Sequence, residues 1–260
     1  MGILNVAPDS FYDGGFRSSI PDQLSQVETM LRDGASLIDI GAVSTKPGAK
    51  EVSVEDELKR LIPSLKAIRN QFPDTILSVD TFQPKVAEEA FRHGADLIND
   101  IYGGVRHDDM FPLVARWNLP YIMMHMKGTP QTMQKNPTYQ DVVAEIAYFF
   151  QQQTAKLRLL GFGKILVDPG FGFGKNLAHN LELLDRLGEI KSAGYPLVVG
   201  ISRKSMIQKA LDVDARHALN GTTIAHVVAL QKGANILRVH DVREACEAIH
   251  LIGMISGKNG

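Results

Sequence analysis

The sequence has one cysteine, Cys246, and no run of eighteen apolar residues. A single cysteine excludes an intramolecular disulfide bond and any zinc site built from several cysteines, and it is compatible with a reducing compartment. The absence of a long apolar run excludes a transmembrane helix, and the first residues lack the basic and apolar regions of a signal peptide. We therefore expect a cytoplasmic protein that is not a membrane protein.

The chain also lacks an excess of charge of either sign. It contains 28 Lys and Arg residues against 29 Asp and Glu residues, for a formal net charge of −1. This balance gives no general attraction to nucleic acid or to an anionic membrane, so neither is an expected partner. Any anion must be bound by a local cluster of cations.

No linker, low-complexity tract or change of composition divides the 260 residues, of which 44% are hydrophobic. Such a chain can bury a large core, and we expect one domain over residues 1–260. Eight short apolar runs without polar alternation are typical of parallel strands covered on both faces. They lie at 3–4, 37–40, 76–79, 97–98, 121–124, 165–167, 197–199 and 236–239.

Amphipathic segments lie between these runs and predict helices. Gly34 and Gly94 end two of them, and Ser53 with Asp56 forms a capping box for another. The main segments are 22–33, 53–68, 84–93, 138–160, 181–190, 218–231 and 242–252. Eight alternations predict an α/β fold, a single (β/α)₈ or TIM barrel, with its active site at the C-terminal ends of the strands. The alternative, an open doubly wound sheet, is disfavoured by the count of eight and by the missing dinucleotide fingerprint after the first strand.

The stretch 165–175 reads I-L-V-D-P-G-F-G-F-G-K and is the most informative segment. An apolar run ends in Asp168, Pro169 stops further pairing, and three alternating glycines allow a close backbone approach. Its spacing matches neither a P-loop nor a Rossmann glycine motif. We interpret it as a buried strand that delivers a carboxylate to the mouth of the barrel.

Polar residues follow the other strands in a pattern sorted by charge. Carboxylates and amides follow strands 2, 3, 4 and 6, and cations cluster after the last two strands, where this fold commonly binds phosphate. The acceptors and the fifth-strand histidine are Asn5, Asp39, Asp80, Asn99, Asp100, His125 and Asp168; the cations are Arg203, Lys204, Arg238 and His240. This sorting predicts a ligand with two parts. Its flat ring, rich in N–H donors, would bind the acceptors, and its phosphorylated arm would bind the cations.

Single residues leave other interpretations open. Asp80 precedes Thr81 and Pro84 and could instead cap the next helix. His125, between two methionines, could be a hydrogen-bonded wall residue. His240 has no second ligand at metal spacing, which argues against zinc. Two early polar loops, residues 7–19 and 41–50, are long for such connections and are expected to be lids or mobile connections.

Nine blocks of the sequence resemble dihydropteroate synthases, a family of folate biosynthesis that sulfonamides inhibit. They include the Asp168 block, Ser202-Arg203-Lys204-Ser205, Arg238-Val239-His240-Asp241-Val242, Ser78-Val79-Asp80-Thr81 and Met1-Gly2-Ile3-Leu4-Asn5-Val6. The resemblance implies a (β/α)₈ transferase, usually a homodimer. It would join 6-hydroxymethyl-7,8-dihydropterin pyrophosphate to p-aminobenzoate, giving 7,8-dihydropteroate and pyrophosphate.

The resemblance also implies roles for individual residues, with Lys204, Asp168, Arg238 and His240 as the catalytic set. Asp80, Asn99 and Asp168 would bind the amino-pyrimidine edge of the pterin, and Lys204 its ring. Arg238 and His240 would bind pyrophosphate. Asn5 would ligate Mg²⁺, with Asp39 supporting the metal site. Phe11, Thr45, Pro47 and Ser202 would shape the p-aminobenzoate pocket, and Phe173 and Arg203 complete the expected substrate-binding set.

Ala7, Val43 and Lys46 depart from the family pattern, which usually has Thr, Glu and Arg at these positions, and a strand or hairpin normally precedes the position of Met1. Lys46 keeps the charge of arginine but loses its bidentate fork. Two alternatives remain: a pterin-binding methyltransferase serving a corrinoid partner, and a non-catalytic pterin-binding protein. The cations after the last two strands argue against the first, and the three departures in the lids keep the second open.

Overall fold

Eight parallel strands form the centre of the structure, a computed structural model that describes residues 1–7, 19–44, 48–49, 51–191 and 194–257. All eight predicted strands are present. Their bounds are β1 (Gly2–Asn5), β2 (Leu37–Gly41), β3 (Ile76–Asp80), β4 (Leu97–Asp100), β5 (Tyr121–Met124), β6 (Ile165–Asp168), β7 (Val198–Val199) and β8 (Ile236–Leu237).

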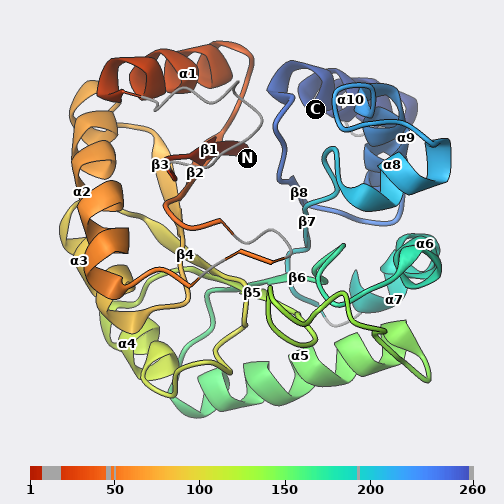
Figure 1. Cartoon of the computed structure of the whole chain (residues 1–260), viewed down its shortest axis with the longest axis horizontal. Coiled ribbons are helices and arrows are strands. Elements are labelled where there is room, and N and C mark those ends of the chain that lie inside the picture. The colour runs from red at the N-terminus through yellow and green to blue at the C-terminus, as the bar shows by residue number, and fades with distance from the viewer. Residues whose placement is uncertain (8–18, 45–47, 50, 192–193, 258–260) are drawn as a thin grey trace.

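The strands close into a barrel. Strands β1 to β6 pair in chain order, and β7 pairs with β8. Two parallel bridges join these sheets, one between Val167 and Leu197 and one between Gly2 and Val239. The helices follow one another around the outside of the strands in chain order (Figure 1). The (β/α)₈ prediction is thus confirmed, and the open sheet is excluded.

The helices of the described residues cover the barrel, and two of them were not predicted. The helices are α1 (Ile20–Arg32), α2 (Val54–Gln71), α3 (Pro84–Arg92), α4 (Met110–Trp117), α5 (Val142–Leu159), α6 (Leu177–Asp185), α7 (Leu187–Lys191), α8 (Ser205–Leu211), α9 (Leu219–Gln231) and α10 (Val242–Ile255). Helices α4 and α8 are too short to give a clear helical period, and the segment expected at 181–190 divides into α6 and α7. No helix of the described residues is long and apolar enough to cross a membrane.

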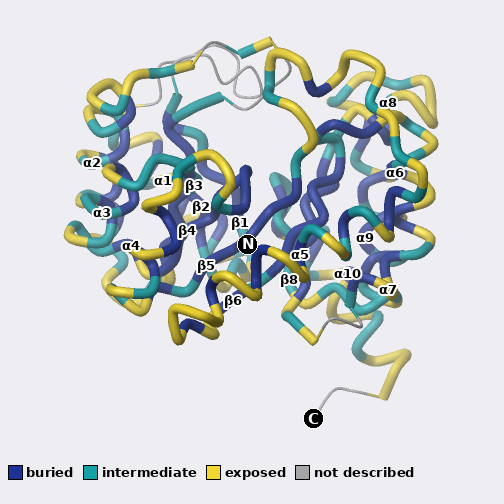
Figure 2. The backbone as a smooth tube through the Cα atoms, turned by 90° about the horizontal axis from the view of Figure 1, so that it is seen from below, coloured by how far each residue is buried: buried dark blue, intermediate teal, exposed yellow. Residues whose placement is uncertain are grey.

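Apolar side chains pack on both sides of the strands. The larger core lies between strands and helices, and includes Ile38, Ile40, Leu77 and Val79, none of which is exposed. A smaller cluster inside the barrel joins Leu97, Ile122 and Val198. Figure 2 shows the buried residues gathered on the strands. Asp39 and Ser78 alternate with the outward-facing residues of β2 and β3, and neither is exposed. The Ser78 hydroxyl donates to the Asp39 carboxylate. The interior of the barrel around these two residues is therefore polar.

A buried carboxyl on α2 makes stability depend on pH. Glu57 is 2% exposed, and burial raises its pKa to about 7 from 4.5, with a hydrogen bond from Thr81 acting in the opposite direction. Between these pH values the unfolded chain loses a proton that the folded chain keeps. Glu57 therefore destabilises the fold progressively from pH 4.5 to 7, by about 3 kcal/mol above pH 7.

Glu57→Gln is accordingly expected to raise the free energy of unfolding at pH 8 and to change it little at pH 4.5. Urea unfolding at both pH values measures this difference. Glu55→Gln, at an exposed position of the same helix turn, is the matched control and should change stability at neither pH. An equal effect of Glu57→Gln at both pH values would contradict the prediction.

Candidate active site

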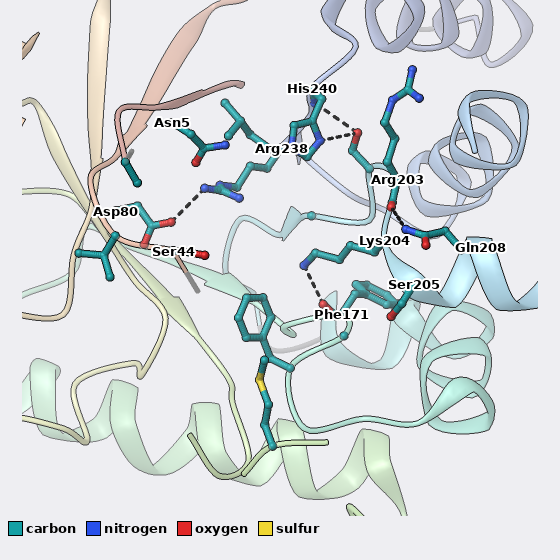
Figure 3. A pocket seen from close by; sticks show the side chains of 18 of the residues that line it. Asn5, Ser44, Asp80, Phe171, Arg203, Lys204, Ser205, Gln208, Arg238 and His240 are labelled. Carbon is teal, nitrogen blue, oxygen red and sulfur yellow. Dashed lines mark hydrogen bonds and ion pairs between the residues drawn. The ribbon is translucent and has the colours of Figure 1, made fainter. Parts of the chain in front are cut away.

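A cavity of about 330 Å³ opens at the C-terminal ends of the strands. Its walls come from the ends of β1 and β3 and from the segments after β6, β7 and β8 (Figure 3). Eight of the predicted site residues line it, namely Asn5, Asp80, Phe173, Ser202, Arg203, Lys204, Arg238 and His240. The structure thus brings together residues that lie more than 230 positions apart in the sequence.

Arg238 connects the acidic and basic sides of this cavity. Its Nε donates to Oδ2 of Asp39 at 2.6 Å, and its Nη2 donates to Oδ2 of Asp80 at 3.0 Å. Ser78 and Asn99 donate to the same buried Asp39 carboxylate, at 2.5 and 3.1 Å. Asp39 therefore has donors on both oxygens, and Asn99 is left with its amide oxygen as an acceptor.

Asp80 stands at the end of β3 and faces the cavity. Burial raises its pKa to about 7, and Arg238 acts in the opposite direction. The effect of Arg238 is limited because one guanidinium serves two carboxylates. Among the described residues, Oδ1 of Asp80 has no hydrogen-bond partner, so this oxygen can accept from a ligand. The alternative role as a helix cap is not seen, since α3 has Gln83 at its N-cap.

Asp168 lies behind Gly200, close to Lys204, but it is not among the residues that line the cavity, and neither are Asp39 and Asn99. A Cβ atom at Gly200 would lie 3.8 Å from Oδ2 of Asp168 and 3.7 Å from Nζ of Lys204. The other Asp168 oxygen accepts from the Gly170 backbone at 2.8 Å. Burial raises the pKa of Asp168, and Lys204 opposes this effect. Burial also lowers the pKa of Lys204 to about 8, with Asp168 acting the other way.

The Lys204 ammonium is held by the loop that follows β6. Nζ donates to the Phe171 carbonyl at 2.7 Å and lies 4.6 Å from the centre of the Phe173 ring. These contacts point the side chain across the cavity (Figure 3). The ammonium and the Phe173 ring therefore form one wall, which offers a donor and an aromatic face to a flat ligand.

His240 and Ser202 are neighbours after β8 and β7. The backbone N–H of His240 donates to Oγ of Ser202 at 3.2 Å, and Nδ1 lies at the same distance from that oxygen. Burial, together with Arg238, lowers the pKa of His240 to about 4. His240 is therefore a neutral hydrogen-bonding group at neutral pH, and not one of the cations expected from the sequence.

Arg203 also differs from the sequence expectation. Its Nε and Nη2 donate to both oxygens of Asp241, at 2.8 and 2.7 Å, and Nη1 donates to the carbonyls of Ala215 and Arg216. Figure 3 shows the side chain directed away from the cavity. The guanidinium holds the segments after β7, α8 and β8 together, so its charge is already matched by Asp241 and is not presented to an anion.

The predicted metal residues differ in their suitability for Mg²⁺. Asn5 lines the cavity at the end of β1, and Mg²⁺ accepts a few protein oxygens together with phosphate oxygens and water. Asp39 lies within β2 and is not exposed, and its carboxylate accepts hydrogen bonds from three donors, Ser78, Asn99 and Arg238. The geometry fits Asn5 as a ligand and fits Asp39 as a supporting group that acts through Arg238 and Asn99. No group of three or more His, Cys, Asp or Glu suited to a metal occurs among the described residues.

Three predicted p-aminobenzoate residues, Phe11, Thr45 and Pro47, lie outside the described residues, as does Lys46. Ala7 and Val43, two of the departures from the family pattern, do line the cavity. Both are smaller or less polar than the usual residues, so these two positions supply neither a hydroxyl nor a carboxylate, although the neighbouring Ser44 lines the cavity and carries a hydroxyl.

Sequence reasoning missed residues from the loop between β5 and α5. Met133 and Gln134 line the cavity, and Nε2 of Gln134 donates to the Gly172 carbonyl at 2.7 Å. The loop carries no strand-end signal, because these residues lie nine or more positions beyond β5.

The comparisons with known proteins agree with this geometry. The sequence model of the family described as "pterin binding enzyme" matches residues 1–240. The chain is 47% identical over 254 residues to the dihydropteroate synthase of Escherichia coli K12, covering 97% of this chain and 89% of that protein.

Solved structures give the same result. The Yersinia pestis dihydropteroate synthase in a sulfonamide drug complex superposes with a TM-score of 0.94 at 44% identity, over 98% of this chain and 93% of that one. The Xanthomonas albilineans dihydropteroate synthase with 4-aminobenzoic acid has a TM-score of 0.90 at 38% identity, over 98% and 92%.

Proposed function

Because the chain belongs to the family of pterin binding enzymes, we propose that the residues of this cavity carry out its reaction in the roles given below. The reaction is that of a dihydropteroate synthase, a transferase of folate biosynthesis. It joins 6-hydroxymethyl-7,8-dihydropterin pyrophosphate to p-aminobenzoate and releases pyrophosphate. The observation that carries the assignment of roles is one cavity in which Asp80, at the end of β3, faces the donors that follow β7 and β8, with the β6 carboxylate Asp168 directly behind Gly200 of the wall.

The pterin ring binds over the base of the cavity. Asp80 Oδ1, Asp168 Oδ2 and the amide oxygen of Asn99 accept hydrogen bonds from the amino-pyrimidine edge, which is rich in N–H groups. Lys204 donates to the ring from the opposite side, and the Phe173 ring covers it. These acceptors are held before the substrate arrives, because Gly170, Arg238 and Asp39 fix their positions.

The pyrophosphate arm extends toward β1 and β8. Arg238 uses two of its five N–H groups on Asp39 and Asp80, which leaves three for phosphate oxygens. Neutral His240 has one N–H and Ser202 one O–H, and their contact at Nδ1 uses one of these, so the pair offers one donor from the same side. We propose that Asn5 would hold a Mg²⁺ ion, which would supply positive charge for the pyrophosphate group.

Bond exchange takes place at the pterin methylene. The C–O bond to pyrophosphate breaks with its electron pair leaving on oxygen, and the neutral amine of p-aminobenzoate forms the new C–N bond. Arg238 and His240 stabilise the developing charge of the leaving group. The carboxylates facing the ring favour electron donation to the methylene. The resulting anilinium loses its proton to water, so no strong general base is required.

The direct test measures pyrophosphate release from the purified protein given the pterin pyrophosphate and Mg²⁺, with and without p-aminobenzoate. We expect release coupled one-to-one to 7,8-dihydropteroate. Release without product would place the defect in the p-aminobenzoate pocket, where Ala7 and Val43 depart from the family pattern. Binding of the pterin without release would support a non-catalytic pterin-binding protein instead.

Affinity for the pterin pyrophosphate should fall above pH 8. In the free protein, burial lowers the pKa of Lys204 to about 8. An anionic ligand favours the ammonium form of this lysine. Above pH 8, Lys204 must therefore take up a proton when the ligand binds. Between pH 8 and 9.5 this linkage predicts a loss of affinity of about tenfold. Calorimetric titration in the presence of Mg²⁺ measures it. Lys204→Met should bind more weakly and without this pH dependence, and an unchanged profile in that variant would contradict the assignment.

We also propose, from composition and the family pattern, one domain over residues 1–260, a homodimer and a cytoplasmic location. A sequence with one cysteine, Cys246, is compatible with the last point. Sedimentation of the purified protein tests the dimer.

A further inference from the structure

Lys175 is a buried cation that the reaction described above does not use. It is 2% exposed, lies directly after the last glycine of the Asp168 motif, and is not among the residues that line the cavity. Its ammonium group contacts three acceptors: the Gly170 carbonyl at 2.9 Å, the Phe173 carbonyl at 3.0 Å and Nδ1 of His125 at 3.1 Å. Each of its three N–H donors therefore has a partner.

Nδ1 of His125 can accept a hydrogen bond from Lys175 only when the imidazole ring is neutral. Burial, reinforced by Lys175 and Lys127, lowers the pKa of His125 well below its usual value. With the proton on Nε2, Nδ1 is free to accept from Lys175. The expectation that His125 is a hydrogen-bonded wall residue fits this contact, whereas no local pattern indicated that its partner would be a lysine fifty positions away.

The two carbonyls belong to the glycine loop, which we define as residues 170–174. Gly170 and Gly174 have positive φ angles of 71° and 66°, and a Cβ atom would lie 2.0 Å from the His125 carbonyl or 2.3 Å from the Lys127 carbonyl. The loop is thus pressed against the backbone after β5. This explains the glycines at 170 and 174. Gln134, Asn180 and Tyr139 bond to the backbone at Gly172 and Gly174, and Lys175 is the side chain that bonds to the carbonyls of Gly170 and Phe173.

The glycine loop directs successive carbonyls to different partners. The carbonyls of Gly170 and Phe173 point to Lys175, whereas the intervening Phe171 carbonyl accepts from Lys204 in the cavity. The loop also carries the Phe173 ring, which lies against the same Lys204 ammonium. A rotation of the peptide units at Gly170 or Phe173 would therefore move both contacts of Lys204.

A buried ammonium is not needed for stability alone. Its desolvation costs free energy, and burial lowers the pKa of Lys175 to about 7, with Asp168 acting in the opposite direction. An apolar side chain of the same length would fill the space without this cost. What such a side chain could not do is fix two carbonyls on one side of the loop.

We propose that Lys175 is a positioning residue of the reaction, whose ammonium holds the glycine loop in the conformation that presents the Phe171 carbonyl and the Phe173 ring to Lys204 and the substrates. This inference rests on the proposed function. It assigns to Lys175 no contact with either substrate, and it places its effect on the geometry of the cavity wall.

The test compares Lys175→Met with Lys164→Met, which replaces an exposed lysine just before β6. Lys175→Met is expected to keep its thermal unfolding temperature within a few degrees and to lower kcat/KM for both substrates by about 10- to 100-fold, the scale of a displaced catalytic group. Lys164→Met should match the unaltered protein. A Lys175→Met protein with full kcat/KM would overturn the inference, whereas an unaltered protein without product formation would instead overturn the proposed function.

Two further comparisons separate positioning from simple packing. Lys175→Cys in a Cys246→Ser background, alkylated after unfolding with 2-bromoethylamine and refolded, regains an ammonium group at nearly the original place. Alkylation with 1-iodopropane adds the same length without charge. We expect only the amine to restore activity, and equal activity of the two products would overturn the inference.

His125 provides an independent comparison if the Lys175 variants do not fold. His125→Gln keeps an acceptor for Lys175, and His125→Leu removes it. We expect the Gln variant to retain most activity and the Leu variant to lose about tenfold or more. Equal activity of these two variants would also overturn the inference.

Discussion

Asp168→Asn is expected to lower kcat/KM for the pterin pyrophosphate by about 10²- to 10³-fold, the usual effect of losing one preorganised electrostatic group. The reason lies in the two oxygens of Asp168. Oδ1 accepts from Gly170 at 2.8 Å, and an amide oxygen can replace it there, so the turn after β6 is kept. The other oxygen becomes an NH₂ group that can no longer accept from the N–H groups of the pterin.

The same substitution should not reduce stability. Burial raises the pKa of Asp168, so the folded state binds a proton more tightly than the unfolded state. This carboxylate therefore destabilises the fold increasingly as the pH rises above the pKa that Asp168 has in the unfolded chain. Asp168→Asn should unfold at the same or a higher urea concentration at pH 8.

Steady-state kinetics and urea unfolding test both statements. Asp185→Asn, an exposed position at the end of α6, is the matched control and should leave both quantities unchanged. Full pterin turnover by Asp168→Asn would remove Asp168 from the binding site. Lost activity accompanied by lost stability would mean that the carboxylate acts through the fold.

The strands and most helices were predictable because their signals are local. In the run Ile165 to Val167, Ile165 and Val167 are buried and Leu166 is partly buried on the other face. Ser53 caps α2 through the N–H of Asp56 as expected. Helices α4 and α8 were missed because they span eight and seven residues. Two turns leave too few positions for a helical period to stand out against short apolar runs.

The members of the cavity were predictable, but their pairing was not. Strand-end positions placed Asp80, Lys204 and Arg238 at one mouth, which is a consequence of barrel topology. Whether a guanidinium faces solvent, a ligand or a carboxylate depends on side chains 38 to 199 positions away. Arg203 is bound by Asp241 and Arg238 by Asp39, and no local pattern distinguishes these two outcomes in advance.

Arg238→Met is expected to cost about 3–5 kcal/mol of stability at pH 8, as is typical when one partner of a buried ion pair is removed. The Asp39 and Asp80 carboxylates would lose bonds of 2.6 and 3.0 Å, and Asp39 would keep only Ser78 and Asn99. Dihydropteroate formation should fall by about 10³-fold, because donors to the leaving pyrophosphate disappear as well. Arg243→Met, which removes an exposed arginine of α10, is the control and should be nearly neutral.

The pH dependence of this loss identifies its cause. Arg238 lowers the pKa of Asp80, which burial raises to about 7, so the folded-state pKa should rise further without Arg238. A carboxyl whose pKa is higher in the folded state than in the unfolded state destabilises the fold increasingly as the pH rises above its unfolded-state pKa. The loss of stability in Arg238→Met should therefore be larger at pH 8 than at pH 5. Adding Asp80→Asn should restore part of the stability, but none of the activity, because the carboxylate that binds the pterin is then also absent. A defect of equal size at both pH values, or no recovery in the double variant, would show that Arg238 stabilises the barrel by packing and not by pairing with these carboxylates.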